Sequence, residues 1–232
     1  MIMKNYHHLV LSIIVLENKI NIDMGFKQKI KRNFLFRGVY YLLRDYFLDC
    51  RRSRFGYIAE DVTLMPPLRI SNPENVFLYG KNCLRNADIM VTNAKFIMKP
   101  HARAAEGLRV TTGNHHMVLG RFFSSITEDE KPKNLDKDVV VESDAWIGRN
   151  CSIMPGVTIG RGCTIGACSL ISRDIPPYCV AVGVPAKPVK FKWTIDEILY
   201  HEEQLYSVEE RYTREQLEKI FAEVKEKYPN IK

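Results

Sequence analysis

The sequence lacks the cysteine patterns of a disulfide-stapled or zinc-binding protein. Its six cysteines include no CxxC pair and no zinc-finger spacing, although the chain has 232 residues. Scattered thiols of this kind are typical of a reducing compartment, where neither a disulfide framework nor a structural metal is expected. We therefore predict a cytoplasmic protein without a metal site.

A hydrophobic run long enough to cross a bilayer is also missing near the N-terminus. The apolar stretch LVLSIIVL, residues 9–16, has eight residues, whereas a membrane-spanning helix needs about 20. It also makes a poor secretory signal, because Lys4 alone supplies a basic residue before it and no small-residue cleavage pattern follows. Met24 is a second candidate for the native first residue, so the status of residues 1–23 stays open.

An excess of one charge is absent from most of the chain. Residues 55–232 carry 23 basic and 23 acidic side chains, so the net charge of +7 lies in residues 1–54. A neutral main body argues against a nucleic-acid partner. Residues 24–54 have apolar side chains at helical spacing, which predicts a basic amphipathic helix. We expect it to pack on the main domain; peripheral contact with the anionic inner membrane surface is the alternative.

What the sequence does contain is a repeat of six residues. Aliphatic side chains recur at this spacing at Val141, Ile147, Ile153, Ile159, Ile165 and Ile171. Small or apolar residues follow four places on, at Ala145, Cys151, Val157, Cys163 and Ser169. This period fits short strands joined by tight corners in a solenoid, and it fits neither an amphipathic helix nor a hairpin meander. We predict that the aliphatic residues point inward and that Gly148, Gly160 and Gly166 supply permissive backbone at the corners.

The repeat continues upstream in weaker form. Met98, Ala104 and Val110 keep the phase, and Tyr79, Arg85 and Val91 follow it weakly. The stretch MPPLRISNPENV, residues 65–76, breaks it.

These patterns predict three segments. Residues 1–54 form an N-terminal helical segment, and residues 55–192 form an all-β solenoid interrupted by a loop excursion at 113–138. Residues 193–232 form two helices, because Thr194 with Glu197 and Thr213 with Gln216 have the spacing of capping boxes.

One long motif resembles a known family. The stretch VVVESDAWIGRNCSIMPGVTIGRGCTIGACSLISRDIPPYCVAVGVPAKPVK closely resembles the C-terminal half of the hexapeptide-repeat O-acetyltransferases. That family includes maltose, nodulation-factor, capsular-polysaccharide and xenobiotic acetyltransferases. The resemblance covers residues 56–192, and DAWIG with GVPAKPVK makes it specific. It implies a left-handed parallel β-helix, a homotrimer, and acetyl-CoA bound in clefts between neighbouring subunits.

The resemblance also implies a histidine that accepts the proton of the acceptor hydroxyl. TGNH places His115 at that position, with His116 as the alternative, because neighbours in an extended loop point to opposite sides. An imidazole titrates near neutral pH and can take this proton while an alcohol attacks a thioester. A zinc site is disfavoured, because it needs converging imidazoles and the body of the chain offers only His101 besides this adjacent pair.

Cofactor contacts follow from the same resemblance, motif by motif. The implied contacts are Trp146 beside the pantetheine arm of CoA, the backbone of Gly166 and Ala167, the pair Ser172 and Arg173, and Lys187 and Lys190 at the phosphates. The sequence GACS departs from the more usual Ala-Gly here, and it puts Cys168 beside the expected cofactor.

The excursion is the segment most able to line the acceptor. We expect contacts from Asn114, Arg121, Phe122 and Phe123, since the two aromatic rings can stack on a pyranose. The prediction is an acetyl-CoA-dependent O-acetyltransferase acting on a capsular polysaccharide, exopolysaccharide or other cell-surface glycan precursor. Xenobiotic acetyl transfer of the chloramphenicol or streptogramin type, N-transfer to a sugar nucleotide, and a β-helix scaffold stay open as alternatives.

Overall fold

The computed structural model describes residues 34–231, and the chain divides into two units, residues 1–44 and 45–232. Helix α3 (Phe34–Leu43) lies in the first unit and is followed by the π-helical turn η1 (Arg44–Leu48). The apolar stretch 9–16, Met24 and the beginning of the predicted basic helix lie outside the described residues. No helix in the described part of the chain is long and apolar enough to cross a bilayer.

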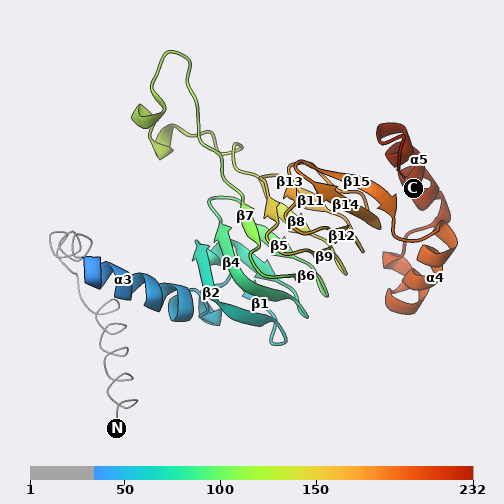
Figure 1. Cartoon of the computed structure of the whole chain (residues 1–232), viewed down its shortest axis with the longest axis horizontal. Coiled ribbons are helices and arrows are strands. Elements are labelled where there is room, and N and C mark those ends of the chain that lie inside the picture. The colour runs from blue at the N-terminus through green and yellow to red at the C-terminus, as the bar shows by residue number, and fades with distance from the viewer. Residues whose placement is uncertain (1–33, 232) are drawn as a thin grey trace, which may run out of the picture. The chain divides into compact units, whose positions relative to one another are not determined.

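The second unit is the predicted β-solenoid, whose strands stack in parallel on three faces (Figure 1). Face A consists of β1 (Tyr57–Ile58), β3 (Val76–Leu78), β5 (Phe96–Met98), β8 (Val139–Val141) and β11 (Thr158–Ile159). Face B consists of β6 (Arg103–Ala104), β9 (Trp146–Ile147), β12 (Thr164–Ile165) and β14 (Cys179–Gly183), with β15 (Ala186–Phe191) antiparallel to β14. Face C consists of β7 (Arg109–Thr111), β10 (Ser152–Ile153) and β13 (Leu170–Ile171). The longer strands β2 (Thr63–Ser71) and β4 (Cys83–Met90) each continue from face B to face C.

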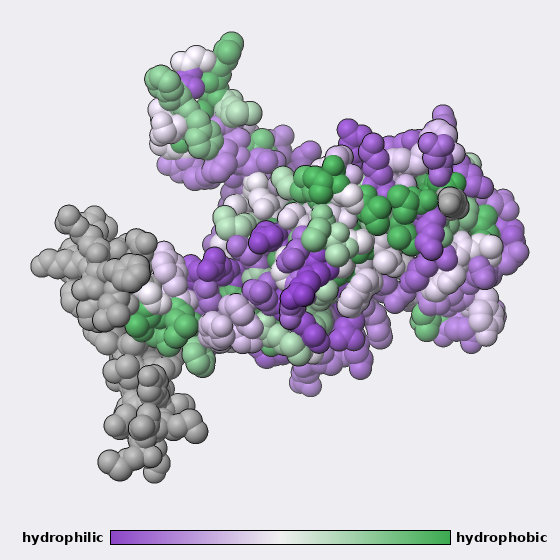
Figure 2. Space-filling view, viewed as in Figure 1, coloured by the Kyte–Doolittle hydropathy of each residue, from purple (hydrophilic) through white to green (hydrophobic). Residues whose placement is uncertain are grey.

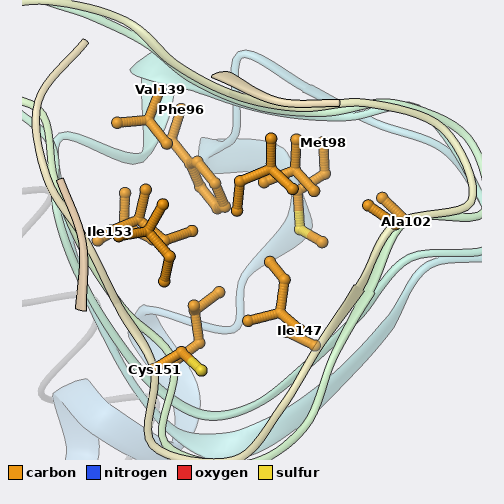
Figure 3. Packing of buried hydrophobic residues seen from close by; sticks show 14 of the residues in the cluster. Phe96, Met98, Ala102, Val139, Ile147, Cys151 and Ile153 are labelled. Atoms are coloured by element: carbon orange, nitrogen blue, oxygen red, sulfur yellow. The ribbon is translucent and has the colours of Figure 1, made fainter. Parts of the chain in front are cut away.

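The six-residue phase sets the register of the coils. Val141 pairs with Ile159, Ile147 with Ile165 and Ile153 with Ile171, so each regular coil contains 18 residues. All six predicted aliphatic residues are buried, and Figure 3 shows such side chains filling the triangular interior. Burying one isoleucine side chain stabilises a fold by roughly 1.5–3 kcal/mol. This continuous stack is therefore the main source of stability of the solenoid.

The corner glycines serve a different need from the one predicted. Gly148 and Gly160 do not adopt a positive φ, whereas non-glycine corner residues such as Asp144 (φ 58°) and Asn150 (φ 56°) do. A Cβ added at Gly148 would lie 2.6 Å from the backbone nitrogen of Ala167, and one at Gly160 would approach the next coil equally closely. Glycine is thus required there because adjacent coils touch at the corners.

The weak upstream phase is confirmed at Val91, which is buried in the core, but it is off by one residue at Tyr79 and Arg85. Leu78 and Leu84 point into the core, whereas Tyr79 is exposed and Arg85 is only half-buried. The coil from Leu78 to Met98 contains 20 residues rather than 18. A shift of one residue along a strand moves every side chain to the other face of the sheet. Extra residues in a coil can therefore turn a position that the regular repeat predicts as inward into an outward one.

The stretch that breaks the repeat still forms part of the sheet. It lies largely in β2, which pairs with β4 and shifts register between Met65 and Leu68. The irregularity includes two consecutive prolines, which lack the N–H groups that continue a ladder. The short helices η2 (Arg52–Arg54) and η3 (Pro73–Asn75) flank this first coil.

A long loop and two helices complete the unit. Between β7 and β8 the chain leaves the solenoid and projects from it, with the short turns η4 (Phe123–Ser125) and η5 (Glu128–Glu130) (Figure 1). After β15 come α4 (Ile195–Leu205), η6 (Val208–Glu210) and α5 (Arg214–Lys227). Both predicted capping boxes are present, at Thr194 and at Thr213.

Candidate active site

A row of outward-facing side chains crosses face B from one coil to the next. Trp146 pairs with Thr164, Thr164 with Val180, and Val180 with Lys190. Trp146 and Lys190 are exposed, and the two residues between them are half-buried. At about 4.8 Å between strands, the row extends about 14 Å from Trp146 to Lys190. It provides an aromatic ring and a cation at opposite ends of a shallow track.

Three more predicted cofactor residues lie along this track. Gly166 and Ala167 follow β12 at the corner between faces B and C, and Lys187 pairs with Val182 on the β14–β15 hairpin. Neither Lys187 nor Lys190 forms an ion pair with any residue that the structure describes, and both are exposed. Two unpaired ammonium groups at one end of the row suit an anionic ligand.

The other two predicted cofactor residues lie elsewhere. Ser172 and Arg173 follow β13 on face C, at the corner between faces C and A. The excursion with His115 leaves the solenoid at the same corner, two coils earlier. In a triangular coil this corner lies opposite face B. The structure thus separates the predicted site into two sets on opposite sides of one chain.

His115 lies on the exposed first part of the excursion. Its ring contacts Phe123 edge-to-face, with the ring centroids 4.8 Å apart. His116 is half-buried beside it. No carboxylate among the described residues lies within hydrogen-bonding distance of either imidazole. The histidine therefore presents free nitrogen atoms to whatever approaches the loop.

A buried carboxylate, Asp136, anchors both ends of the excursion. It accepts hydrogen bonds from the backbone N–H of Asn114 at 3.0 Å and from the hydroxyl of Thr92 at 2.8 Å. The ammonium of Lys131 lies 2.8 Å from Oδ1, the same carboxylate oxygen that accepts from Asn114. Burial alone raises the pKa of this carboxyl, but the ammonium and the hydrogen bonds outweigh burial and lower the pKa to about 2. Asp136 thereby fixes the backbone next to His115, a role that the sequence pattern did not reveal.

The predicted acceptor residues differ in their contacts: one is bound within the loop and the other three are exposed. Arg121 forms an ion pair with Glu130 and donates to the carbonyl of Ser125 at 2.7 Å, so it holds the loop together. Asn114 is exposed, as are Phe122 and Phe123. The projecting loop carries apolar surface that is visible in Figure 2. Exposed apolar patches of this kind are typical of surfaces that bind a ligand or another chain.

A cavity of about 520 Å³ opens on face B next to Trp146. Its charged lining comprises Arg85, Arg103, Glu106 and Arg149. Sequence reasoning missed these residues, although Arg103 occupies the outward slot before Ala104 just as Trp146 does before Ile147. Within the described residues, no group of three His, Cys, Asp or Glu side chains is placed to hold a metal ion.

Comparisons with known proteins agree with this architecture. The family model for the bacterial transferase hexapeptide (six repeats) matches residues 138–173. The chain is 27% identical over 146 residues to the galactoside O-acetyltransferase of Escherichia coli K12, covering 60% of this chain and 65% of that protein. It is 39% identical over 77 residues to a chloramphenicol acetyltransferase of Klebsiella aerogenes, covering 33% and 35%. The matches span less than two thirds of these relatives.

Solved structures show the same fold. A hexapeptide-repeat-containing acetyltransferase of Vibrio cholerae O1 biovar eltor, complexed with acetyl coenzyme A, superposes with a TM-score of 0.54 at 22% identity, over 72% of this chain and 84% of that one. A galactoside acetyltransferase in complex with coenzyme A gives 0.53 at 22% identity, over 82% and 92%. Together with the six-residue repeat, these likenesses show that the chain has the β-solenoid fold of the hexapeptide-repeat acetyltransferases and resembles them in sequence.

Proposed function

We propose that the protein transfers an acetyl group from acetyl-CoA to a hydroxyl of a sugar, in a cell-surface glycan precursor. The observation that carries the proposal is the row on face B, which places Trp146 and Lys190 about 14 Å apart on one open track. The phosphates of CoA meet Lys187 and Lys190, and its arm extends along the track towards Trp146. Acetyl-CoA supplies the activated acetyl thioester.

The base comes from the opposite corner of a second copy. His115 is exposed and far around the coil from face B, so one chain cannot close the site by itself. We propose a homotrimer in which the excursion of one subunit reaches face B of its neighbour, with Ser172 and Arg173 on the same side as the excursion. Most closed homo-oligomers are cyclic, and a heterologous contact of this kind closes into a ring.

In that arrangement the imidazole of His115 accepts the proton of the acceptor hydroxyl as its oxygen attacks the thioester carbonyl. The C–S bond breaks and the sulfur of CoA leaves with a proton. Trp146 limits the access of water to the thioester, and the unpaired lysines hold the phosphates.

The first test replaces His115 by alanine. We expect CoA release with a panel of glycosides to fall by about 10²- to 10⁴-fold, the range for losing a general base. The affinity for acetyl-CoA should persist, because the phosphates and the arm lie on face B. His116→Ala is the matched control; if it abolishes turnover while His115→Ala does not, the roles are reversed. A wild-type protein that turns over neither a glycoside nor a xenobiotic acceptor supports a scaffold.

A xenobiotic acceptor is the second candidate. Met117, Leu119 and Phe122 are exposed on the excursion and offer an apolar lining that suits such a molecule. Turnover of chloramphenicol with no turnover of any glycoside would favour it. Amino sugars in the same panel separate N-transfer from O-transfer.

A further inference from the structure

We propose that the cavity on face B binds an acidic sugar, so that the acceptor carries a carboxylate or a phosphate group. This inference rests on the proposed function and names its substrate class. It concerns the residues Arg85, Arg103 and Arg149, which the sequence pattern did not single out.

The cavity is part of the same outward row as the proposed cofactor track. Arg103 pairs with Trp146, and Cys83 pairs with Arg103, so the row continues beyond the tryptophan by two coils. These three residues line the cavity together with the arginines from the adjoining corner. Its volume of about 520 Å³ lies within the range of small-molecule sites.

The lining has an excess of positive charge. Glu106 forms an ion pair with Arg149 and so neutralises one of the three guanidinium groups. The Nε of Arg85 donates to the sulfur of Cys83 at 3.3 Å; Glu106 acts on this guanidinium electrostatically, but no carboxylate in the described part of the chain lies within ion-pair distance of it. Arg103 is exposed and likewise has no ion-pair partner there. Within the described residues, two of the three guanidinium groups that line the cavity therefore have no carboxylate within ion-pair distance.

Guanidinium groups in this setting indicate the chemistry of the ligand. Arginine presents a planar fork that matches a carboxylate or phosphate in bidentate geometry. A neutral sugar needs no such excess of charge, since hydroxyls are bound equally well by amides and hydroxyls. The exposed ring of Trp146 beside the arginines offers an apolar face on which a pyranose can stack.

The position of the cavity assigns this charge to the acceptor rather than to CoA. Lys190 lies about 14 Å from Trp146 towards one end of the row, and Arg103 lies about 5 Å from Trp146 towards the other end. The phosphates of CoA are at one end of the molecule and the thioester is at the other. With the phosphates at the lysines, the thioester points towards Trp146, and the group beyond it is the acceptor.

The experiment measures binding by the full-length protein in the presence of CoA. The probes are a methyl hexoside, the matching methyl hexuronide and the matching hexose 6-phosphate, in the gluco and galacto series. We expect an acidic probe to bind at least about tenfold more tightly than its neutral counterpart, and the preference to shrink with added salt. The two acidic arms distinguish carboxylate from phosphate.

Arg103→Gln is the diagnostic variant, and Arg109→Gln is its control, because Arg109 is an exposed arginine on face C. We expect Arg103→Gln to weaken acidic probes about tenfold and to leave the affinity for acetyl-CoA unchanged. Equal binding of neutral and acidic probes, no binding of either, or equal effects of the two variants would overturn the proposal. Weaker acetyl-CoA binding by Arg103→Gln would assign the cavity to the cofactor instead. Turnover of neutral glycosides alone would contradict this inference but would still agree with the proposed function.

Discussion

At the scale of single residues, Asp136 controls the backbone that carries His115. It is buried with the ammonium of Lys131 at 2.8 Å, and it accepts hydrogen bonds from Asn114 at the start of the excursion and from Thr92 in the coil before it. A buried ion pair is weak evidence for net stability, but removal of one partner leaves an uncompensated charge and costs about 3–5 kcal/mol. The loop base is therefore sensitive to this one carboxylate.

Asp136→Asn should loosen the base of the excursion without unfolding the solenoid. The substitution leaves the buried ammonium of Lys131 without its main charged partner, and it leaves one acceptor oxygen in place of two for the donors Asn114 and Thr92. We expect hydrogen exchange at the amide of Asn114 to speed up by at least about tenfold. Asp138→Asn is the control, because Asp138 is exposed and, among the described residues, accepts a hydrogen bond from the backbone N–H of Lys95 alone. Indistinguishable exchange in the two variants would show that Asp136 is not the anchor.

The same carboxylate predicts a pH dependence. Its pKa is lowered from an ordinary value of 3.8 to about 2 in the folded protein. A depressed pKa means that this contribution to stability is complete above about pH 4 and is lost as the pH falls towards 2. Amide protection at the loop base should therefore persist to about pH 4 and fail below it.

At the scale of elements, a buried network attaches helix α4 to the last coil. The hydroxyl of Tyr178 donates to Glu202 at 2.5 Å, and the guanidinium of Arg161 lies 2.8 Å from the other oxygen of the same carboxylate. Burial, together with the nearby carboxylate, raises the pKa of Tyr178, so the phenol stays protonated and continues to donate. The rings of Tyr206 and Tyr212 cover the guanidinium.

Glu202→Gln should destabilise the fold, since the amide cannot neutralise the largely buried Arg161. We expect a loss of about 3 kcal/mol, which corresponds to a fall in Tm of roughly 6–12 °C for a domain of this size. Thermal unfolding followed by circular dichroism measures it. The neighbouring Glu203 is exposed, so Glu203→Gln should shift Tm by about 2 °C or less. Equal shifts for the two variants would mean that the network does not hold the helix.

Elements with a local signal could be predicted from the sequence. The caps at Thr194 and Thr213 lie where the capping boxes placed them, because a cap depends on residues three positions apart. The six-residue repeat from Val141 to Ile171 likewise predicted correctly which side chains point inward, because the repeat is also a local pattern. The prediction that Tyr79 points inward was wrong. The length of the upstream coils depends on which strands pair, and no local pattern in the sequence encodes that pairing.

At the scale of the whole molecule, the predicted catalytic and cofactor residues do not meet within one chain. The excursion that carries His115 leaves the solenoid at the corner opposite face B. Trp146 and Lys190 lie on face B itself. The sequence could suggest each residue by its motif, but the distribution over faces and corners emerges only when the coils are stacked. For the same reason it gave no sign of the anchor Asp136 or of the arginine cavity. The geometry makes the proposed site depend on a second copy of the chain.

This dependence predicts that two inactive variants can restore each other. The first is His115→Ala, and the second is the double variant Lys187→Ala with Lys190→Ala, which should bind acetyl-CoA poorly. In a ring of mixed subunits, some interfaces join an intact excursion from one variant to an intact face B from the other. With equal amounts and random assembly, about one quarter of the interfaces are of this kind.

Refolding the two variants together should therefore recover up to about one quarter of the wild-type rate of CoA release. Each variant refolded alone is the control for residual activity, and a labelled wild-type subunit shows that exchange has occurred. Exchange without recovery would contradict the proposal that His115 of one subunit serves face B of its neighbour.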